Sequence, residues 1–195
     1  MGVFVRDTFT DTDGTLLESH TGELGATWTL HPSFSAGNAE IQGNKVHLLD
    51  PVPAYYASGV PPSAEYTLYC EFSLEANIDA NTTLELYGRF STSVNTHYDV
   101  IMNFFNQEWS LRKVVASSGT VLGTFPMTID ARRGWRVKFI LRDAKKSLYV
   151  NDELLLTSTD NEITDANRAG LLFGGLSSEV YVDNFLALTT KTLLT

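Results

Sequence analysis

The 195-residue sequence predicts an all-β protein, an antiparallel sandwich of two sheets, and three observations support this prediction. Apolar and polar residues alternate in many short segments with the two-residue period of half-buried strands. Turn-forming residues separate these segments, among them Ser117-Ser118-Gly119 and Asn151-Asp152. No segment carries an apolar stripe of helical period over three turns, and we expect at most a short helical turn at 160–167.

The alternation predicts about ten strands in the part of the chain that follows residue 65. In chain order they span 66–76, 83–91, 97–105, 108–116, 120–127, 136–142, 147–150, 153–159, 170–175 and 180–188. In the first of them Cys70 alternates in phase with Leu68 and Phe72, which indicates a small apolar core residue. In the sixth, Val137 and Phe139 share one face while Lys138 lies on the other. The strands at 147–150 and 153–159 flank Asn151-Asp152, whose residue types favour a tight hairpin turn.

Composition restricts the classes of protein that this chain can belong to. No linker or block of charge divides the sequence, so we expect a single β-sandwich domain over 1–195. No apolar run approaches 20 residues, the opening segment lacks the pattern of a secretory signal, and Arg6 stands where a myristoylation signal has Ser or Thr. The net charge of −9 disfavours binding to nucleic acid. We therefore expect neither a membrane nor a nucleic acid as partner.

Six segments resemble the concanavalin A-like lectin/glucanase superfamily, specifically the laminin G-like jelly rolls common in bacteriophage structural proteins and bacterial sugar-binding modules. They are 7–28, 97–114, 134–141, 147–160, 168–175 and 180–185. The resemblance implies that the first and last strands pair, with Phe9 near Val182 and Phe185. It also implies a virion component, a head decoration or tail-associated protein that assembles in the host cytoplasm with other virion proteins and as a homo-oligomer. The Glu-x-Asp-x-Glu pattern of the glycanase members is absent from this chain.

An acidic group at the two ends of the chain is the candidate metal site. Jelly rolls of the resembled superfamily often hold a structural Ca²⁺ between their terminal strands, which implies Asp7 and Asp183 as ligands, with Asp11 and Asp13 nearby. The alternative is that these carboxylates cap turns by hydrogen bonding. Apart from this possible calcium we expect no cofactor.

The polar face of the central strands is the candidate contact surface for a glycan or a protein partner. Its predicted members are Tyr69, Glu71, Glu75, Glu85, Tyr87, Arg89, Asp99 and Asn103. Aromatic rings suit the apolar faces of sugars, and carboxylates and amides suit their hydroxyls. The alternatives are an ordinary solvated sheet face and a glycosidase that uses Glu71 and Glu85 as its paired carboxylates.

The loop at 51–63 is a second candidate contact site. It presents Tyr55 and Tyr56 among four prolines, which stiffen the segment. Because neighbouring residues of an extended segment point in opposite directions, the alternative is that one of the two rings faces the core.

Catalytic and metal motifs are otherwise missing from the sequence. His20, His31, His47 and His97 do not have the spacing of zinc ligands, and no Gly-x-Ser-x-Gly nucleophile motif occurs. Trp28, Trp109 and Trp135 are expected in the core or at sheet edges. We therefore expect a non-enzymatic virion structural or interaction module. The alternative is a carbohydrate-binding module or a divergent glycoside hydrolase that acts on surface glycans.

Overall fold

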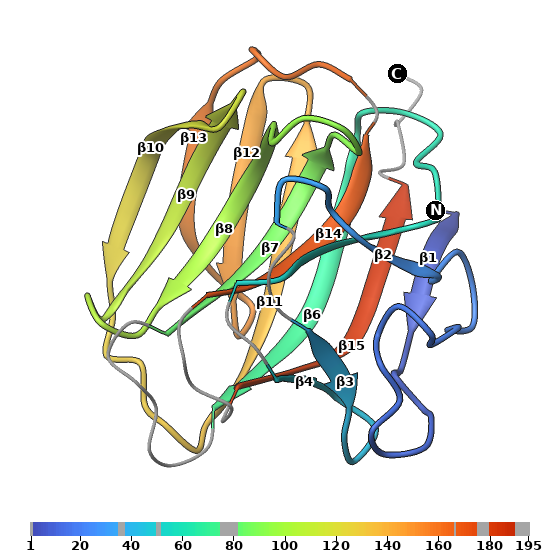
Figure 1. The fold of residues 1–195 in the computed structure, drawn as a ribbon. Helices are drawn as coiled ribbons and strands as arrows, with labels where there is room; N and C mark the ends of the chain where they lie inside the picture. The colour runs from blue at the N-terminus through green and yellow to red at the C-terminus, as the bar shows by residue number, and fades with distance from the viewer. Residues whose placement is uncertain are drawn as a thin grey trace.

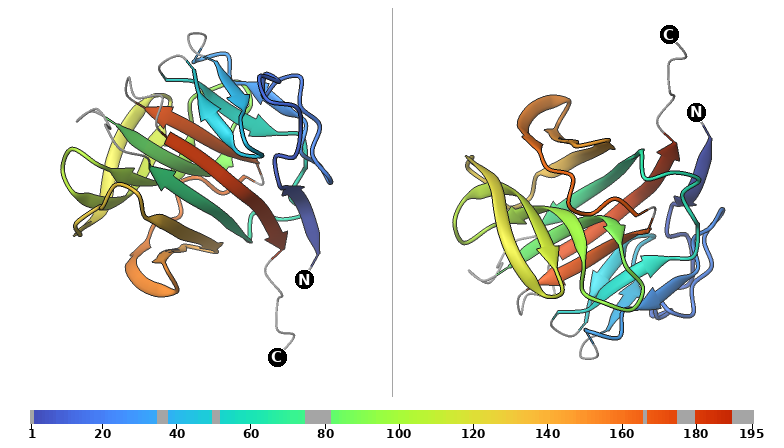
Figure 2. Two further views of the ribbon diagram at one scale, coloured as in Figure 1. Left: turned by 90° about the horizontal axis from the view of Figure 1, so that it is seen from below. Right: turned by 90° about the horizontal axis from the view of Figure 1, so that it is seen from above.

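The computed structural model describes residues 2–34, 38–49, 52–74, 82–165, 167–174 and 180–189. These residues form fifteen strands and no helix. The strands build two antiparallel sheets, one of eight strands and one of seven, which face each other as the two layers of a sandwich (Figures 1 and 2). The predicted all-β sandwich is therefore confirmed. No helix of the described ranges has the length and apolar content needed to cross a membrane.

The eight-stranded sheet contains the hairpins that the alternation predicted near the C-terminal end of the chain. Its order is β13 (Glu153–Thr159), β12 (Lys145–Val150), β11 (Gly134–Arg142), β6 (Tyr66–Leu74), β15 (Val180–Thr189), β4 (Val46–Leu48) and β3 (Ala39–Ile41), and β1 (Val3–Asp7) also pairs with β15. The turn between β12 and β13 places Asn151 and Asp152 at φ values of 50° and 69°, the left-handed geometry that a tight hairpin requires.

The seven-stranded sheet carries the candidate site described below. Its order is β10 (Ser118–Pro126), β9 (Glu108–Val115), β8 (His97–Asn103), β7 (Thr83–Phe90), β14 (Arg168–Gly174), β5 (Ala54–Ala57) and β2 (Trp28–Leu30). Strands β7 to β10 follow one another as a meander, which Figure 1 shows in green to yellow.

The first and last strands pair, as the sequence resemblance implied. Asp7 of β1 lies opposite Phe185 of β15, and Trp28 packs edge-on against Phe185 with ring centroids 5.1 Å apart. Strands β4 and β1 follow each other along the same edge of β15, and on the opposite edge the pairing of β15 with β6 shifts register between Asp183 and Leu186, where Asn184 has a φ of 53°. Phe9 lies beyond the end of β1 and is buried beside Trp28.

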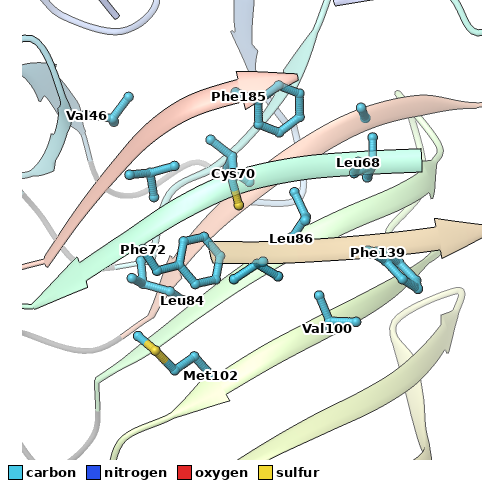
Figure 3. Packing of buried hydrophobic residues seen from close by; sticks show 14 of the residues in the cluster. Val46, Leu68, Cys70, Phe72, Leu84, Leu86, Val100, Met102, Phe139 and Phe185 are labelled. Atoms are coloured by element: carbon cyan, nitrogen blue, oxygen red, sulfur yellow. The ribbon is translucent and has the colours of Figure 1, made fainter. Parts of the chain in front are cut away.

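The core fills the space between the two sheets with the residues that the alternation assigned to it. Figure 3 shows Leu68, Cys70 and Phe72 of β6 packed against Leu84 and Leu86 of β7 and Val100 and Met102 of β8. All three tryptophans are buried in this core. Because inward and outward residues alternate along every strand, the opposite faces of the sheets are left for polar contacts.

Two expectations need correction in detail. The chain forms five short strands, β1 to β5, in the N-terminal region where the alternation indicated none, because three to five residues are too few to show a period. The short helical turn expected at 160–167 is not helical in its described residues. Residues 75, 76 and 175 of the predicted strands and Ala166 of the predicted turn lie outside the described ranges.

Candidate functional site

A cavity of about 300 Å³ lies over the outer face of the seven-stranded sheet. Its polar lining includes side chains that alternate with core residues along β7, β8 and β9, namely Thr83, Glu85, Tyr87, His97 and Arg112. Its apolar lining consists of Phe34, Val52, Val114 and Leu172. The volume is at the lower end of the range for small-molecule sites, and the mixture of apolar walls with a few convergent polar groups is typical of them.

The polar centre of the cavity is a guanidinium held between two carboxylates from neighbouring strands. Arg112 Nη2 donates hydrogen bonds to Glu85 Oε2 at 2.9 Å and to Asp99 Oδ2 at 2.6 Å, and Arg112 Nε donates to Asp99 Oδ2 at 3.0 Å. Tyr87 Oη also donates to Glu85 Oε2, at 2.9 Å. Asp99 is fully buried and Glu85 nearly so. These contacts fix the side chains in one arrangement before any ligand arrives.

The crowding of charge changes the acid–base behaviour of this cluster. Burial, together with the neighbouring charge of Asp99, raises the pKa of Glu85 to about 7, although Arg112 and Tyr87 act in the opposite direction. Burial also disfavours the charged form of Arg112, but the two carboxylates outweigh it and raise the pKa of the guanidinium. Burial and Glu85 raise the pKa of Tyr87 well above its usual range. Glu85 is therefore the member of this cluster that titrates near neutral pH.

An aromatic group supports the cluster from one side. The Tyr87 ring stacks on His97 with centroids 3.9 Å apart, and Phe90 meets both rings edge-on. His97 Nε2 lies 3.0 Å from Asp99 Oδ2, whereas His97 Nδ1 has no hydrogen-bond partner among the residues that the structure describes. Asn95 also lines the cavity, and its buried Oδ1 has no hydrogen-bond partner in the same part of the chain. Both residues therefore line the cavity, while the two atoms themselves lie beneath its surface.

The structure divides the predicted contact surface between the two sheets. Tyr87 and Asp99 lie together with Glu85 on the outer face of the seven-stranded sheet. Tyr69 and Glu71 belong to β6 in the other sheet, opposite Lys138 and Arg136 of β11. The expectation of one shared concave surface is therefore wrong, and Glu71 and Glu85 lie on different sheets and do not form a carboxylate pair.

Arg89 and Asn103 have local structural roles. Arg89 is 1% exposed, and its guanidinium donates to the carbonyl oxygens of Ala64, Ile163 and Asp143. Asn103, at the end of β8, accepts a hydrogen bond from the backbone N–H of Asn106 through its side chain. Arg89 joins the loops at one rim of the sandwich, and Asn103 caps the turn into β9.

The two tyrosines of the 51–63 loop lie on β5 and point in opposite directions; Pro51 lies outside the described ranges. Tyr55 is buried in the core, where its hydroxyl accepts a hydrogen bond from the backbone N–H of Ala39. Burial raises the pKa of Tyr55 to about 12. Tyr56 lies on the outer face and packs with Phe90. The alternative in which one ring faces the core describes this geometry, and Tyr56 lies beside the aromatic group that supports the cavity.

The acidic residues near the chain ends serve a hydrogen-bonded network. Asp7 is buried and accepts from His20 Nε2 at 3.0 Å, from Trp28 Nε1 at 2.7 Å and from the backbone N–H of Phe9. His20 Nδ1 contacts Asp11 at 3.0 Å. Burial disfavours the charged ring, but the hydrogen bonds to both aspartates outweigh it and raise the pKa of His20.

These contacts bear on the predicted calcium site. Protein donors reach both carboxylate oxygens of Asp7, which is the hydrogen-bonding role that the sequence offered as the alternative to a calcium site. Asp183 accepts from the backbone N–H of Asn184, and burial raises the pKa of Asp183, which disfavours the charged form that a cation needs. Across the described ranges, no group of three or more His, Cys, Asp or Glu side chains is placed to hold a metal ion.

Besides Glu85 and Tyr87, the cavity has five polar side chains that the sequence prediction missed, namely Thr83, Asn95, His97, Arg112 and Ser117. The sequence pattern singles out His97 only as a histidine without the spacing of a zinc ligand. Arg112 alternates with Leu111 and so carries the same outward signal as Glu85, but only the register of β9 against β8 places it opposite Asp99. Asn95 lies in the loop before β8 and carries no periodic signal.

The fold is a two-sheet β-sandwich, and it is similar to the jelly-roll folds of several solved structures. Carbohydrate-binding module CBM66 from Bacillus subtilis is 13% identical, with a TM-score of 0.72 over 83% of this chain and 95% of that one. A Bacillus subtilis protein of unknown function with a galectin-like fold is 9% identical, with a TM-score of 0.71 over 97% and 96% of the two chains. Bacillus licheniformis β-glucanase is 11% identical, with a TM-score of 0.63 over 98% and 99%.

These likenesses are structural alone. No family model matches the sequence, and no curated protein is significantly similar to it in sequence.

Proposed function

We propose that this chain is a carbohydrate-binding module and that its saccharide occupies the cavity on the outer face of the seven-stranded sheet. The observation that carries the proposal is the cluster of Glu85, Asp99 and the half-buried Arg112, which mutual hydrogen bonds hold in a partly apolar cavity. Saccharides need such a combination, because each ring offers hydroxyls at its edge and apolar C–H groups on its faces.

The structural neighbours favour this function over a virion role. One of them is described as a carbohydrate-binding module and another as a β-glucanase, and none of the three named above is described as a particle component. The virion role, with its protein partners and oligomer, rests on the resemblance of sequence segments alone. Binding to a surface glycan is compatible with a free carbohydrate-binding module and with a virion component.

The module is proposed to bind its saccharide without cleaving it. A glycosidase needs one carboxyl group free to donate a proton and a second that is free to act as a base or nucleophile. Here both carboxylates accept hydrogen bonds from the same nitrogen of Arg112. Because Glu85 and Asp99 share this partner, both carboxylates are held against the guanidinium and serve a structural role.

The test is affinity electrophoresis through gels that contain soluble polysaccharides, namely β-glucan, galactan, mannan and fructan. We expect retardation by at least one of them, and we expect Val114→Phe, which fills the cavity, to abolish it. Tyr69→Ala, on the outer face of the opposite sheet, is the matched control and should be retarded like the wild type. If retardation is lost in Tyr69→Ala and kept in Val114→Phe, the saccharide site lies on the eight-stranded sheet instead.

The same polysaccharides test the absence of catalysis. Incubation with the purified protein should release no reducing sugar. Release of reducing sugar by the wild type that disappears in Glu85→Gln would show that the protein is a glycoside hydrolase and not a binding module. No retardation by any polysaccharide would refute the proposed function itself.

A further inference from the structure

The Nη1 nitrogen of Arg112 is a polar atom of the cavity that is both free and accessible. The side chain of Arg112 is 29% exposed and lines the cavity. Within the described residues Nη1 makes no hydrogen bond, and it is not one of the buried atoms there that lack a partner, so it has accessible surface. It carries two N–H donors. A ligand in the cavity can therefore accept hydrogen bonds from Nη1.

The other nitrogens of Arg112 hold Nη1 in place. Nε and Nη2 both donate to Asp99 Oδ2, at 3.0 and 2.6 Å, so this carboxylate occupies the side of the guanidinium that the two nitrogens share. The second hydrogen of Nη2 lies on the Nη1 side, and it reaches Glu85 Oε2 at 2.9 Å. Because the guanidinium is planar, the two carboxylates fix its plane and leave Nη1 as its free end.

Neighbouring polar groups of the cavity are engaged within the protein. The hydroxyl of Tyr87 donates to Glu85 Oε2, and His97 Nε2 contacts Asp99 Oδ2. Arg112 differs from these groups because it keeps two donors on a charged group for a ligand. Hydrogen bonds from a charged donor contribute more to binding than those between neutral groups.

Val52 supplies exposed apolar surface to the wall of the same cavity. Its side chain is 42% exposed, and its φ of 65° lies in the left-handed region, which is strained for a β-branched residue. Backbone strain of this kind is concentrated at ligand sites. Val114 and Leu172 of the same wall are almost fully buried, so they offer a ligand far less apolar surface than Val52 does.

Resting on the proposed function, we infer that Arg112 and Val52 are the residues by which the cavity recognises its saccharide. Arg112 Nη1 donates hydrogen bonds to hydroxyl oxygens of the sugar, and Val52 packs against its apolar C–H groups. Asp99 and Glu85 are positioning residues, which act through the guanidinium that they hold. The recognised sugar unit therefore presents a hydroxyl oxygen as acceptor beside an apolar face.

The first test replaces the guanidinium and keeps its charge. The probe is whichever of the soluble β-glucan, galactan, mannan and fructan retards the wild type. Lysine keeps a cation for the two carboxylates but has no Nη1, so Arg112→Lys should weaken binding about tenfold or more, the factor that one hydrogen bond from a charged donor contributes. Arg136→Lys, on the outer face of the other sheet, is the matched control and should bind like the wild type.

The outcomes of this test separate the inference from the proposed function. Wild-type affinity in Arg112→Lys would overturn the inference and leave the carbohydrate-binding function in place. Failure of all four polysaccharides to retard the wild type would instead refute the function.

The second test separates binding from stability at Val52. Val52→Gly removes the apolar side chain and suits the left-handed backbone, so it should weaken binding about fivefold and leave stability in urea unchanged or higher. Val60→Gly, at another exposed valine that does not line the cavity, is the matched control and should bind like the wild type. Unchanged binding in Val52→Gly would overturn the role of Val52 in recognition.

A third measurement needs no variant at Arg112. In ¹⁵N spectra of arginine side chains we expect separate Nη1 and Nη2 resonances for Arg112, because the two carboxylates hinder rotation of the guanidinium. Oligosaccharides of the polysaccharide that binds should shift the Nη1 resonance more than the Nη2 resonance. An Nη1 resonance that does not move at saturation would overturn the inference.

The same spectra test the positioning role of Asp99. Asp99→Asn removes one of the charges that hold the guanidinium, so the two resonances should merge and the affinity for the same oligosaccharides should fall together. Merged resonances with unchanged affinity would overturn the positioning role, which a purely structural part for Asp99 would not predict.

Discussion

The replacement of Glu85 by glutamine should change how the stability of the protein depends on pH. The folded protein raises the pKa of this buried carboxyl group from its ordinary 4.5 to about 7. The folded state thus holds the proton more tightly than the unfolded state does. The stability that Glu85 contributes is therefore fully present below pH 4.5 and is lost as the pH rises through 7.

The size of the effect follows from the two pKa values. Between them the free energy of unfolding changes by about 1.4 kcal/mol for each pH unit, which gives about 3 kcal/mol in total. Glutamine does not titrate and still accepts the hydrogen bond from Arg112. The wild type should therefore lose about 3 kcal/mol relative to Glu85→Gln between pH 4 and pH 8.

Urea unfolding followed by tryptophan fluorescence measures this difference, because all three tryptophans are buried. Ile101→Val, on the same sheet face and without a titratable group, is the control and should shift stability by a constant amount at every pH. Tyr87→Phe removes a hydrogen bond that lowers the pKa of Glu85, so its stability should fall more with pH than that of the wild type. Parallel curves for the wild type and Glu85→Gln across this range would refute the reasoning.

Three further variants test the rest of the structure by the same unfolding measurement. His20 hydrogen-bonds to Asp7 and Asp11, and its pKa is raised above 6.5 in the folded protein. The stability that this raised pKa contributes is fully present below pH 6.5 and is lost as the pH rises through the raised pKa, so the deficit of His20→Gln relative to the wild type should shrink with rising pH. An equal deficit at pH 8.5 would contradict this. Arg89→Met should lose about 4.5 kcal/mol, at roughly 1.5 kcal/mol for each of three hydrogen bonds to carbonyls, and a loss below about 1 kcal/mol would contradict the role assigned to it. Gly170→Ala would place Cβ 2.4 Å from the carbonyl oxygen of Tyr55, so it should destabilise the β14–β5 pairing by more than about 2 kcal/mol, and wild-type stability would disprove that contact.

Most of the strands could be predicted because alternation is a local property. Each predicted strand after residue 65 corresponds to a strand of the structure, because alternation recurs in each of these segments. Strand β4 shows why the N-terminal strands escaped. All three of its residues are buried, so its short segment has no alternation to detect.

The site could be predicted in part, because alternation gives the face of a strand and not the sheet to which it belongs. Glu71 and Glu85 both point away from the core, yet β6 and β7 lie in different sheets. No local feature of the sequence shows that the chain passes from one sheet to the other between β6 and β7.

Arg89 shows a second limit of the pattern. Tyr87 and Phe90 stand an odd number of positions apart, yet their rings meet at 4.8 Å on the same face. The positive φ of Arg89, 51°, changes the phase between them. A prediction that assumes a regular strand therefore assigns Arg89 to the wrong face.

The position of β15 has a consequence for how the molecule folds. The strand that is synthesised last of the fifteen lies between β6 on one side and β4 and β1 on the other. Before residues 180–189 leave the ribosome, the two halves of the eight-stranded sheet have no strand to join them. Pairings that span most of the chain are slow to form, because the loop must close before the contacts stabilise it. We therefore expect the strands on the two sides of β15 to remain unjoined in nascent chains until β15 has been synthesised.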